Sequence, residues 1–150
     1  MGYRGNINVL EIYLEKILHN VETYLLKNRQ IIKVGRITMN VFNYETVASA
    51  DVEDGASKVR VKWLITKAMG AKNFAMRLFE VEPNGYSPLH THPWEHEVFI
   101  LEGNGIVFDG EKATPFKAND VVFIPSDERH QFKNTGRKQL KFLCLIPNKK

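Results

Sequence analysis

The sequence predicts an all-β domain, folded as an antiparallel sandwich or barrel, preceded by one amphipathic α-helix. Two observations lead to this fold class. After Asn28, short runs rich in β-branched and aromatic residues alternate with turn signals. Before that point, apolar residues recur at intervals of three and four, which is the spacing of one helical face. A chain of 150 residues is long enough for a single domain to bury its own core.

The predicted helix extends from Ile7 to Leu26. Its apolar face comprises Ile7, Leu10, Leu14, Ile17, Leu18, Val21 and Leu25. Such a stripe has to be buried, either on the rest of the domain or on a second subunit. We therefore expect residues 1–30 to form an N-terminal helical extension and residues 31–150 to form the β-domain. His19 lies in this helix and is interpreted as a surface histidine.

The predicted strands are four to ten residues long and follow a two-residue periodicity. They are RITMNVF, KVRVKWLI, NFAMRLFEVE, EVFILE, GIVF, DVVFIP and LKFLCLI. Residue pairs that tolerate positive φ separate them and predict tight turns. These pairs are Asp54-Gly55, Asn84-Gly85, Asn104-Gly105 and Asp109-Gly110. Residues 48–57 are predicted to form a flexible surface loop. No internal repeat or linker divides the chain.

Composition narrows the class of protein. The apolar fraction of 43% and the charged fraction of 25% are ordinary for globular domains. The net charge of +4 is spread along the chain without a basic stripe, so no nucleic-acid partner is expected. The only cysteine, Cys144, fits a reducing compartment and is interpreted as an inert core thiol. No secretion signal and no apolar run of about 20 residues is present, so we expect a cytoplasmic protein without a membrane span.

The stretch HTHPWEHEVFILEG holds three of the five histidines of the chain. In an extended segment, His90 and His92 lie on the same face about 7 Å apart, so their imidazoles can bind one ion. A Pro-Trp pair then interrupts the strand, after which either His96 or Glu97 can face the same space. The two-residue periodicity favours His96 but leaves Glu97 open, because periodicity is unreliable across a turn.

A fourth candidate ligand, His130, comes from a distant part of the chain. It follows Pro125 in the stretch DVVFIPSDERHQFKN, where an alternating strand would again project an imidazole inward. Four of the five histidines therefore lie near strand ends with chelating spacing. Histidine is the commonest metal ligand in proteins, so this pattern predicts a metal site in preference to four separate structural histidines.

The first histidine stretch resembles a motif of the cupin family. That motif has a glycine, then H-x-H, then a further ligand, an apolar strand and a second glycine. The matching residues are Gly85, His90, His92, the pair His96 and Glu97, and Gly103, with each glycine one residue closer than is common.

The second cupin motif is matched by Pro125, His130 and Asn134. Asn119 and Asp127 stand where the family usually has glycines. Asn and Asp are the non-glycine residues that best tolerate left-handed backbone conformations, so these departures are mild. The resemblance covers roughly residues 57–147. It is specific, because both motifs occur in order within a segment already predicted to be all-β.

The resemblance implies a single-domain cupin, a double-stranded β-helix or jelly-roll-like barrel, with a metal inside and commonly a homodimeric assembly. The string HPWEHE is most similar to the four-histidine subgroup, whose ligands here would be His90, His92, His96 and His130. One divalent transition metal per chain is expected. Four neutral imidazoles suit Cu, Ni, Zn or Fe, whereas Glu97 in place of His96 would favour Mn or Fe. Glu97 is then either the alternative third ligand, a catalytic acid or base, or a group that orients a ligand.

Four side chains are expected by position to line a dry pocket beside the metal. They are Phe74, Met76, Phe99 and Phe132. The leading hypothesis is a small metal-dependent, dioxygenase-like enzyme that acts on a small organic molecule. Two alternatives stay open: a non-catalytic module that binds or senses a small molecule, and a metal-dependent isomerase or decarboxylase in which Glu97 moves a proton. The expected partners are a small molecule and a second copy of the chain.

Overall fold

The structure is a computed structural model of the chain, and it describes residues 38–148. The chain divides into two compact units, Met1–Arg36 and Ile37–Lys150. All described residues belong to the second unit. The amphipathic helix predicted from Ile7 to Leu26 lies outside the described residues, and the boundary predicted after residue 30 stays a prediction.

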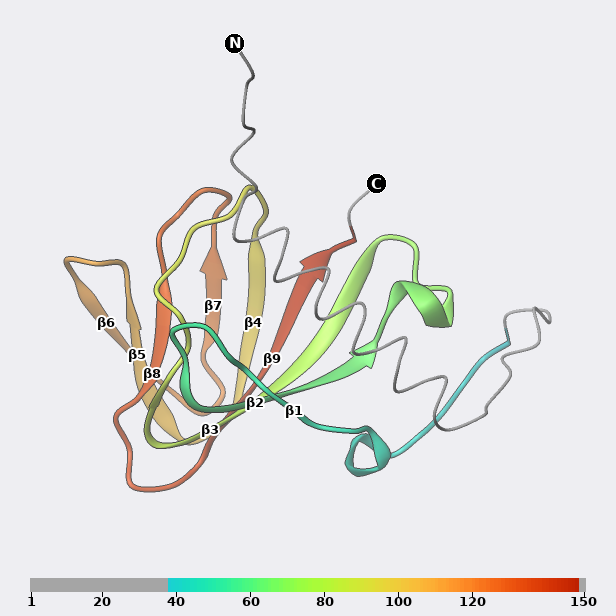
Figure 1. The fold of residues 1–150 in the computed structure, drawn as a ribbon, viewed down its shortest axis with the longest axis horizontal. Helices are drawn as coiled ribbons and strands as arrows, with labels where there is room; N and C mark the ends of the chain where they lie inside the picture. Colours follow the sequence, from blue (N-terminus) through green and yellow to red (C-terminus); the bar gives the residue numbers. More distant parts are fainter. Residues whose placement is uncertain (1–37, 149–150) are drawn as a thin grey trace, which may run out of the picture. The chain divides into compact units, whose positions relative to one another are not determined.

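The described residues form an all-β fold, as the sequence predicts (Figure 1). Its strands are β1 (Ala50–Asp51), β2 (Ser57–Ile65), β3 (Phe74–Tyr86), β4 (His96–Glu102), β5 (Asn104–Phe108), β6 (Ala113–Lys117), β7 (Val121–Ile124), β8 (Gln131–Asn134) and β9 (Leu140–Pro147). Two 3-10 turns, η1 (Tyr44–Thr46) and η2 (Lys67–Met69), are the helical elements of this part of the chain. Residues 38–148 contain no helix that is long and apolar enough to span a membrane.

All strand pairs are antiparallel. The strands pair in the order β6-β5-β8-β3-β9-β4-β7, and β2 also pairs with β3 and carries β1 on its other side. In Figure 1, β5, β6 and β8 gather at one side of the fold, and β3 and β9 cross its centre. Because β3 pairs with β8, the segment that follows β3 and the segment that precedes β8 lie next to each other.

Strand prediction succeeds where the periodicity is strong and fails at the edges. The runs predicted at KVRVKWLI, EVFILE, GIVF and LKFLCLI are confirmed as β2, β4, β5 and β9. The strand predicted at RITMNVF is wrong, because its described residues, 38–42, adopt neither strand nor helix. Strand β6 was not predicted, since Pro115 lacks a backbone donor and lowers strand propensity. It is tolerated because β6 lies at one end of the strand order.

Positive-φ residues confirm some of the predicted turns and correct others. Asn119 and Asp127, which replace the usual glycines of the second motif, have φ of +73° and +65°. The pair Asn104-Gly105 is not a turn, since both residues belong to β5. Gly103, with φ of +83°, makes the turn from β4 into β5. Gly105 instead allows close packing, because a Cβ there would collide with the carbonyl oxygen of Lys133 on β8.

The core lies on one face of β3, β9 and β4. In the antiparallel register, Val81 pairs with Leu140 and Phe79 pairs with Phe142, whose rings stack at 5.1 Å between centroids. Phe142 also pairs with Ile100 across β4. Alternate residues of a strand share a face, so the next inward positions on β3, β9 and β4 are Arg77, Cys144 and Val98, which pair with one another across the strands.

Asn134, the last residue of β8, fastens this strand to its neighbours. Its side-chain amide donates to the carbonyl oxygens of Val81 and Lys138, both at 2.8 Å, and its Oδ1 accepts from the N–H of Gly136 at 2.9 Å. The side chain is buried. All the hydrogen-bonding groups of this amide are therefore used inside the protein, which accounts structurally for the asparagine of the second motif.

We predict that Asn134→Asp destabilises the protein although the change is isosteric. The new carboxyl oxygen would face two carbonyl oxygens to which it cannot donate when ionised. The cost of such unpaired buried groups is at least about 2 kcal/mol in the free energy of unfolding, measurable by urea denaturation. Thr135→Ala, at an exposed neighbouring residue, is the control and should change stability little. Equal stability of Asn134→Asp and the wild type would contradict this role.

Candidate metal centre

Two distant chain segments carry the histidines to one place. His90 and His92 lie between β3 and β4, His96 begins β4, and His130 directly precedes β8. The backbones of His90 and His130 form an isolated bridge, in which each N–H donates to the other residue's carbonyl oxygen, at 3.1 and 3.0 Å. This bridge fixes the two segments relative to each other before any side chain is considered.

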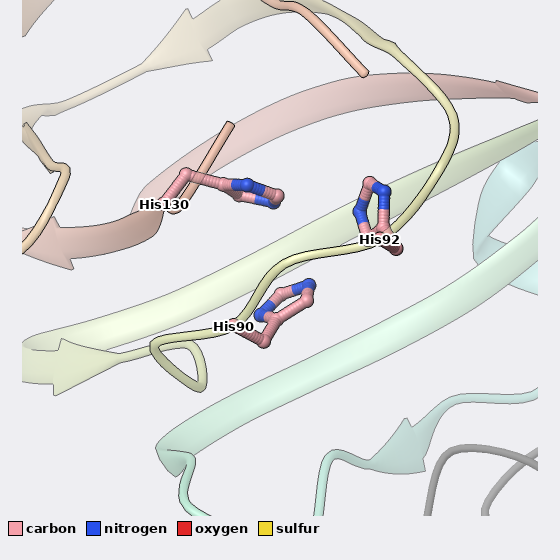
Figure 2. A group of neighbouring side chains, drawn as sticks. All are labelled: His90, His92 and His130. Atoms are coloured by element: carbon pink, nitrogen blue, oxygen red, sulfur yellow. The ribbon is translucent and has the colours of Figure 1, made fainter. Parts of the chain in front are cut away.

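The imidazoles converge on a common space. One ligand nitrogen from each of His90, His92 and His130 lies within 4.8 Å of the other two, so these residues are grouped as a metal site requires. Figure 2 shows the three side chains reaching towards one another from the two segments. His96 joins them from β4, with ring centroids 4.4 Å from His92 and 4.8 Å from His130.

Backbone carbonyls orient two of the rings. Nδ1 of His90 lies 2.9 Å from the carbonyl oxygen of Pro88, and Nδ1 of His130 lies 2.9 Å from that of Glu128. A carbonyl oxygen only accepts, so each Nδ1 donates, and the lone pair of the neutral ring resides on Nε2. Nε2 of His130 is buried without a hydrogen-bond partner in the described structure, and His130 itself is 1% exposed. A metal ion would satisfy this nitrogen.

His92 and His96 face each other directly. Their Nε2 atoms are 2.5 Å apart, a short hydrogen bond in which one ring donates and the other accepts, so both nitrogens are directed into the same space. The ring of His92 is packed between neighbours, since it stacks in parallel on Trp94 with centroids 4.2 Å apart. Nδ1 of His92 is also buried without a partner in the described structure. Together with the preceding contacts, this donor set fits a divalent transition metal with nitrogen ligands.

Burial keeps these histidines neutral. Removal from water lowers the pKa of all four imidazoles, and the charges of neighbouring histidines and of Arg77 act in the same direction on most of them. The pKa of His92 is lowered to about 4. At neutral pH each ring is therefore in the unprotonated form that binds a metal ion.

Glu97 does not lie with the histidines. It follows His96 on β4 and so points to the opposite face of the sheet, where it is exposed and paired with Phe123 and Leu145 on the flanking strands. Of the two residues that the sequence left open, His96 thus lies beside the other imidazoles and Glu97 lies away from them. The group whose nitrogens lie within 4.8 Å of one another comprises His90, His92 and His130, so His96 as a further ligand stays a proposal.

The expected pocket residues are also divided by the pleat of the strands. Phe132 is buried beside His130, with ring centroids 6.5 Å apart. Phe74 and Phe99 are 49% and 40% exposed, and Met76 pairs with Leu145 on the outward face. These three are offset by one residue from the inward positions of β3 and β4, so they do not share the face that carries His96, and their place in a pocket stays a prediction.

Cys144 contacts His96, and Arg77 contacts Cys144, although neither residue was expected to have a functional role. Sγ of Cys144 is 3.1 Å from Nδ1 of His96 and 3.0 Å from Nη2 of Arg77. Cys144 is buried, as expected, and this burial raises the pKa of its thiol. The signal for Arg77 was present in the sequence: it is a lone charge in the apolar run FAMRLF, two residues from the inward-facing Phe79.

Comparisons with known proteins agree with this architecture. The family model described as Cupin domain matches residues 77–146, which include all four clustered histidines. The oxalate-binding protein of Thermotoga maritima is 35% identical over 99 residues, which cover 65% of this chain and 82% of that protein. The 1-methylthio-D-xylulose 5-phosphate methylsulfurylase of Rhodospirillum rubrum is 38% identical over 71 residues, which are 47% of this chain and 46% of that protein.

A solved structure extends the similarity to three dimensions. The polyketide cyclase RemF from Streptomyces resistomycificus superposes with a TM-score of 0.69 at 33% identity, covering 73% of this chain and 80% of the cyclase. The family model, the extent of the match to the Thermotoga protein and the fold shared with the cyclase agree with the two sequence motifs. The chain therefore belongs to the cupin family.

Proposed function

We propose that the protein binds one divalent transition metal ion per chain through His90, His92, His96 and His130, and that this centre holds a small anionic molecule. The observation that carries the proposal is the orientation of the rings. Carbonyl oxygens engage the Nδ1 atoms of His90 and His130 and leave their Nε2 atoms unprotonated. A bound ion of this kind would act as a Lewis acid towards oxygen atoms of a ligand.

The charge around the centre favours an anion. Four neutral imidazoles do not offset the charge of a divalent ion, and Arg77 brings a further positive charge close to them. Within the described residues, the ion pairs are Arg60–Asp51, Lys117–Asp120 and Lys141–Glu102, and none includes Arg77 or a clustered histidine. Buried charge requires compensation, so a bound anion is the complementary ligand. The name of the oxalate-binding relative supports this class of ligand.

We propose metal-dependent binding ahead of any particular reaction. An oxygenase-type enzyme was the leading expectation from the sequence, but the relatives described above are named for binding, sulfur transfer and cyclisation. Glu97 lies on the outer face, so we do not propose it as the acid or base of an isomerase or decarboxylase. We therefore propose binding at the metal as the function. Oxygen uptake that depends on metal and on a bound organic anion would instead favour an oxygenase-type enzyme over a binding protein.

A homodimer and a cytoplasmic location also stay proposals. The dimer is supported by strand β7, which ends the strand order and exposes two large apolar side chains. These are Val121 and Phe123, which are 74% and 63% exposed. An apolar edge of this kind favours pairing with a second copy over exposure to water.

Removing two histidines should abolish metal binding. The variant His90→Ala with His92→Ala loses two nitrogen donors, and we expect stoichiometric metal in the untagged wild type and almost none in the variant, measured by elemental analysis. His19→Ala removes the one histidine outside this cluster and serves as the control. Full metal content in the double variant would show that the ion binds elsewhere.

Metal retention should extend to unusually low pH. Protons displace a metal only where they can protonate the imidazoles, and burial lowers the pKa of each ring, that of His92 to about 4. Ordinary histidines protonate near pH 6.5. We therefore expect Zn²⁺ to stay bound at about pH 5.5 in equilibrium dialysis, under conditions in which a hexahistidine peptide has released it. If the protein releases Zn²⁺ at the same pH as the hexahistidine peptide, the neutral, buried state of the site is contradicted.

Oxalate is the probe for the anion. Isothermal titration calorimetry should show oxalate binding to the Zn²⁺-loaded protein at least about tenfold more tightly than to the metal-free protein. Acetate, which has one carboxylate and cannot chelate through two, should bind more weakly than oxalate. If oxalate binds equally with and without metal, the anion does not bind at the centre proposed here.

A further inference from the structure

A row of inward-facing side chains crosses four strands and ends at the metal centre. Trp63 on β2 pairs with Arg77 on β3, and Arg77 pairs with Cys144 on β9. Cys144 pairs with Val98 on β4, and His96 lies two residues before Val98 on the same face. Diagonal neighbours in an antiparallel sheet are within reach of long side chains. The row therefore connects Arg77, Cys144 and His96 in that order.

Arg77 fixes the sulfur of Cys144 as a hydrogen-bond acceptor. A guanidinium has only donors, so the 3.0 Å contact between Nη2 and Sγ requires the sulfur to accept. The guanidinium is itself held in place by two aromatic rings. Its central carbon lies 5.4 Å from the ring centroid of Trp63 and 5.0 Å from that of Phe79.

The remaining groups of Cys144 leave a defined role for His96. The thiol hydrogen can point to the carbonyl oxygen of Leu145, 3.9 Å from Sγ. The sulfur then has a lone pair for Nδ1–H of His96, at 3.1 Å. If Nδ1 carries the hydrogen, Nε2 of His96 carries the lone pair and faces His92 at the centre.

The other oriented histidines show the same arrangement. Nδ1 of His90 and Nδ1 of His130 each donate to an acceptor outside the cluster, the carbonyl oxygens of Pro88 and Glu128. Cys144 occupies the corresponding place for His96 and is the one side-chain acceptor of the three. A sulfur is a weaker acceptor than a carbonyl oxygen, so its orientation by Arg77 matters more.

We propose that Cys144, oriented by Arg77, is a positioning residue that accepts the hydrogen bond of His96 Nδ1 and thereby holds His96 Nε2 ready as the fourth metal ligand. This inference rests on the proposed metal-binding function. It assigns Cys144 and Arg77 a role beyond that of core packing, in which neither residue touches the metal. Outer partners of metal-bound histidines typically change metal affinity by 10 to 100-fold, which sets the size of the expected effect at roughly that range.

Three variants of the full chain separate the hydrogen bond from packing. Cys144→Val keeps the volume and removes the acceptor, Cys144→Ser restores an acceptor, and Val98→Ala perturbs the paired buried position without touching a hydrogen bond. Metal affinity is measured with Zn²⁺ by chelator competition. The number of coordinating nitrogens is measured with Cu²⁺ by electron paramagnetic resonance, and the folding of each metal-free variant by its thermal melt.

We expect Cys144→Val to bind Zn²⁺ roughly 10 to 100-fold more weakly and to shift the Cu²⁺ spectrum towards that of His96→Ala. Cys144→Ser should recover most of both, and Val98→Ala should change neither. In the His96→Ala background, Cys144→Val should have no further effect on affinity, because it acts through His96. Arg77→Met should resemble Cys144→Val, and Arg77→Lys, which keeps a donor, should lie closer to the wild type.

The outcomes distinguish this inference from the proposed function. Stoichiometric metal in the wild type with unchanged affinity and spectrum in Cys144→Val would overturn the role of Cys144 and leave the metal site intact. Equal shifts in Cys144→Val and Val98→Ala would also overturn it, since packing would then be the cause. If Cys144→Val does not fold, identical behaviour of Arg77→Met and Arg77→Lys decides against the inference. A wild type that binds no metal would overturn both.

Discussion

Two backbone hydrogen bonds between His90 and His130 are the constraint on which the candidate site depends. They join the chain that leaves β3 to the chain that enters β8, and each segment brings its imidazole to the same space. The pairing is anchored nearby, because the N–H of Ser87 donates to the carbonyl oxygen of Phe132 at 2.9 Å. Since these bonds involve only backbone groups, the geometry of the site is set by the fold and not by the side chains that occupy it.

The interior then determines the chemistry that the site can support. Burial lowers the pKa of the four histidines and keeps them neutral, so the imidazoles themselves carry no charge that opposes a metal ion. Outer acceptors turn Nδ1 of three rings away from the centre, with two carbonyl oxygens and one sulfur in this role. The carboxylate of Glu97 stays on the outer face, so the positive charge of an ion and of Arg77 would be left for a ligand to balance.

The sequence predicts those parts of the site that depend on local spacing. The H-x-H pair and the two-residue periodicity anticipate His90 and His92 and favour His96 over Glu97, because alternation along one strand is a local property. Prediction fails where the result depends on which residues lie opposite each other. Phe99 lies one position from the inward face, and the contact between Cys144 and Arg77 arises from the register of β9 against β3, which no single-strand pattern contains.

X-ray absorption at the zinc edge of the Zn²⁺-loaded full chain tests the central claim most directly. The account predicts one ion per chain with a first shell of about four nitrogen or oxygen atoms at roughly 2.0–2.1 Å, with the outer-shell scattering of imidazole rings and no sulfur. A zinc–sulfur distance of about 2.3 Å would make Cys144 a ligand and contradict its assignment as an outer acceptor. A first shell without imidazole scattering would contradict the metal centre itself.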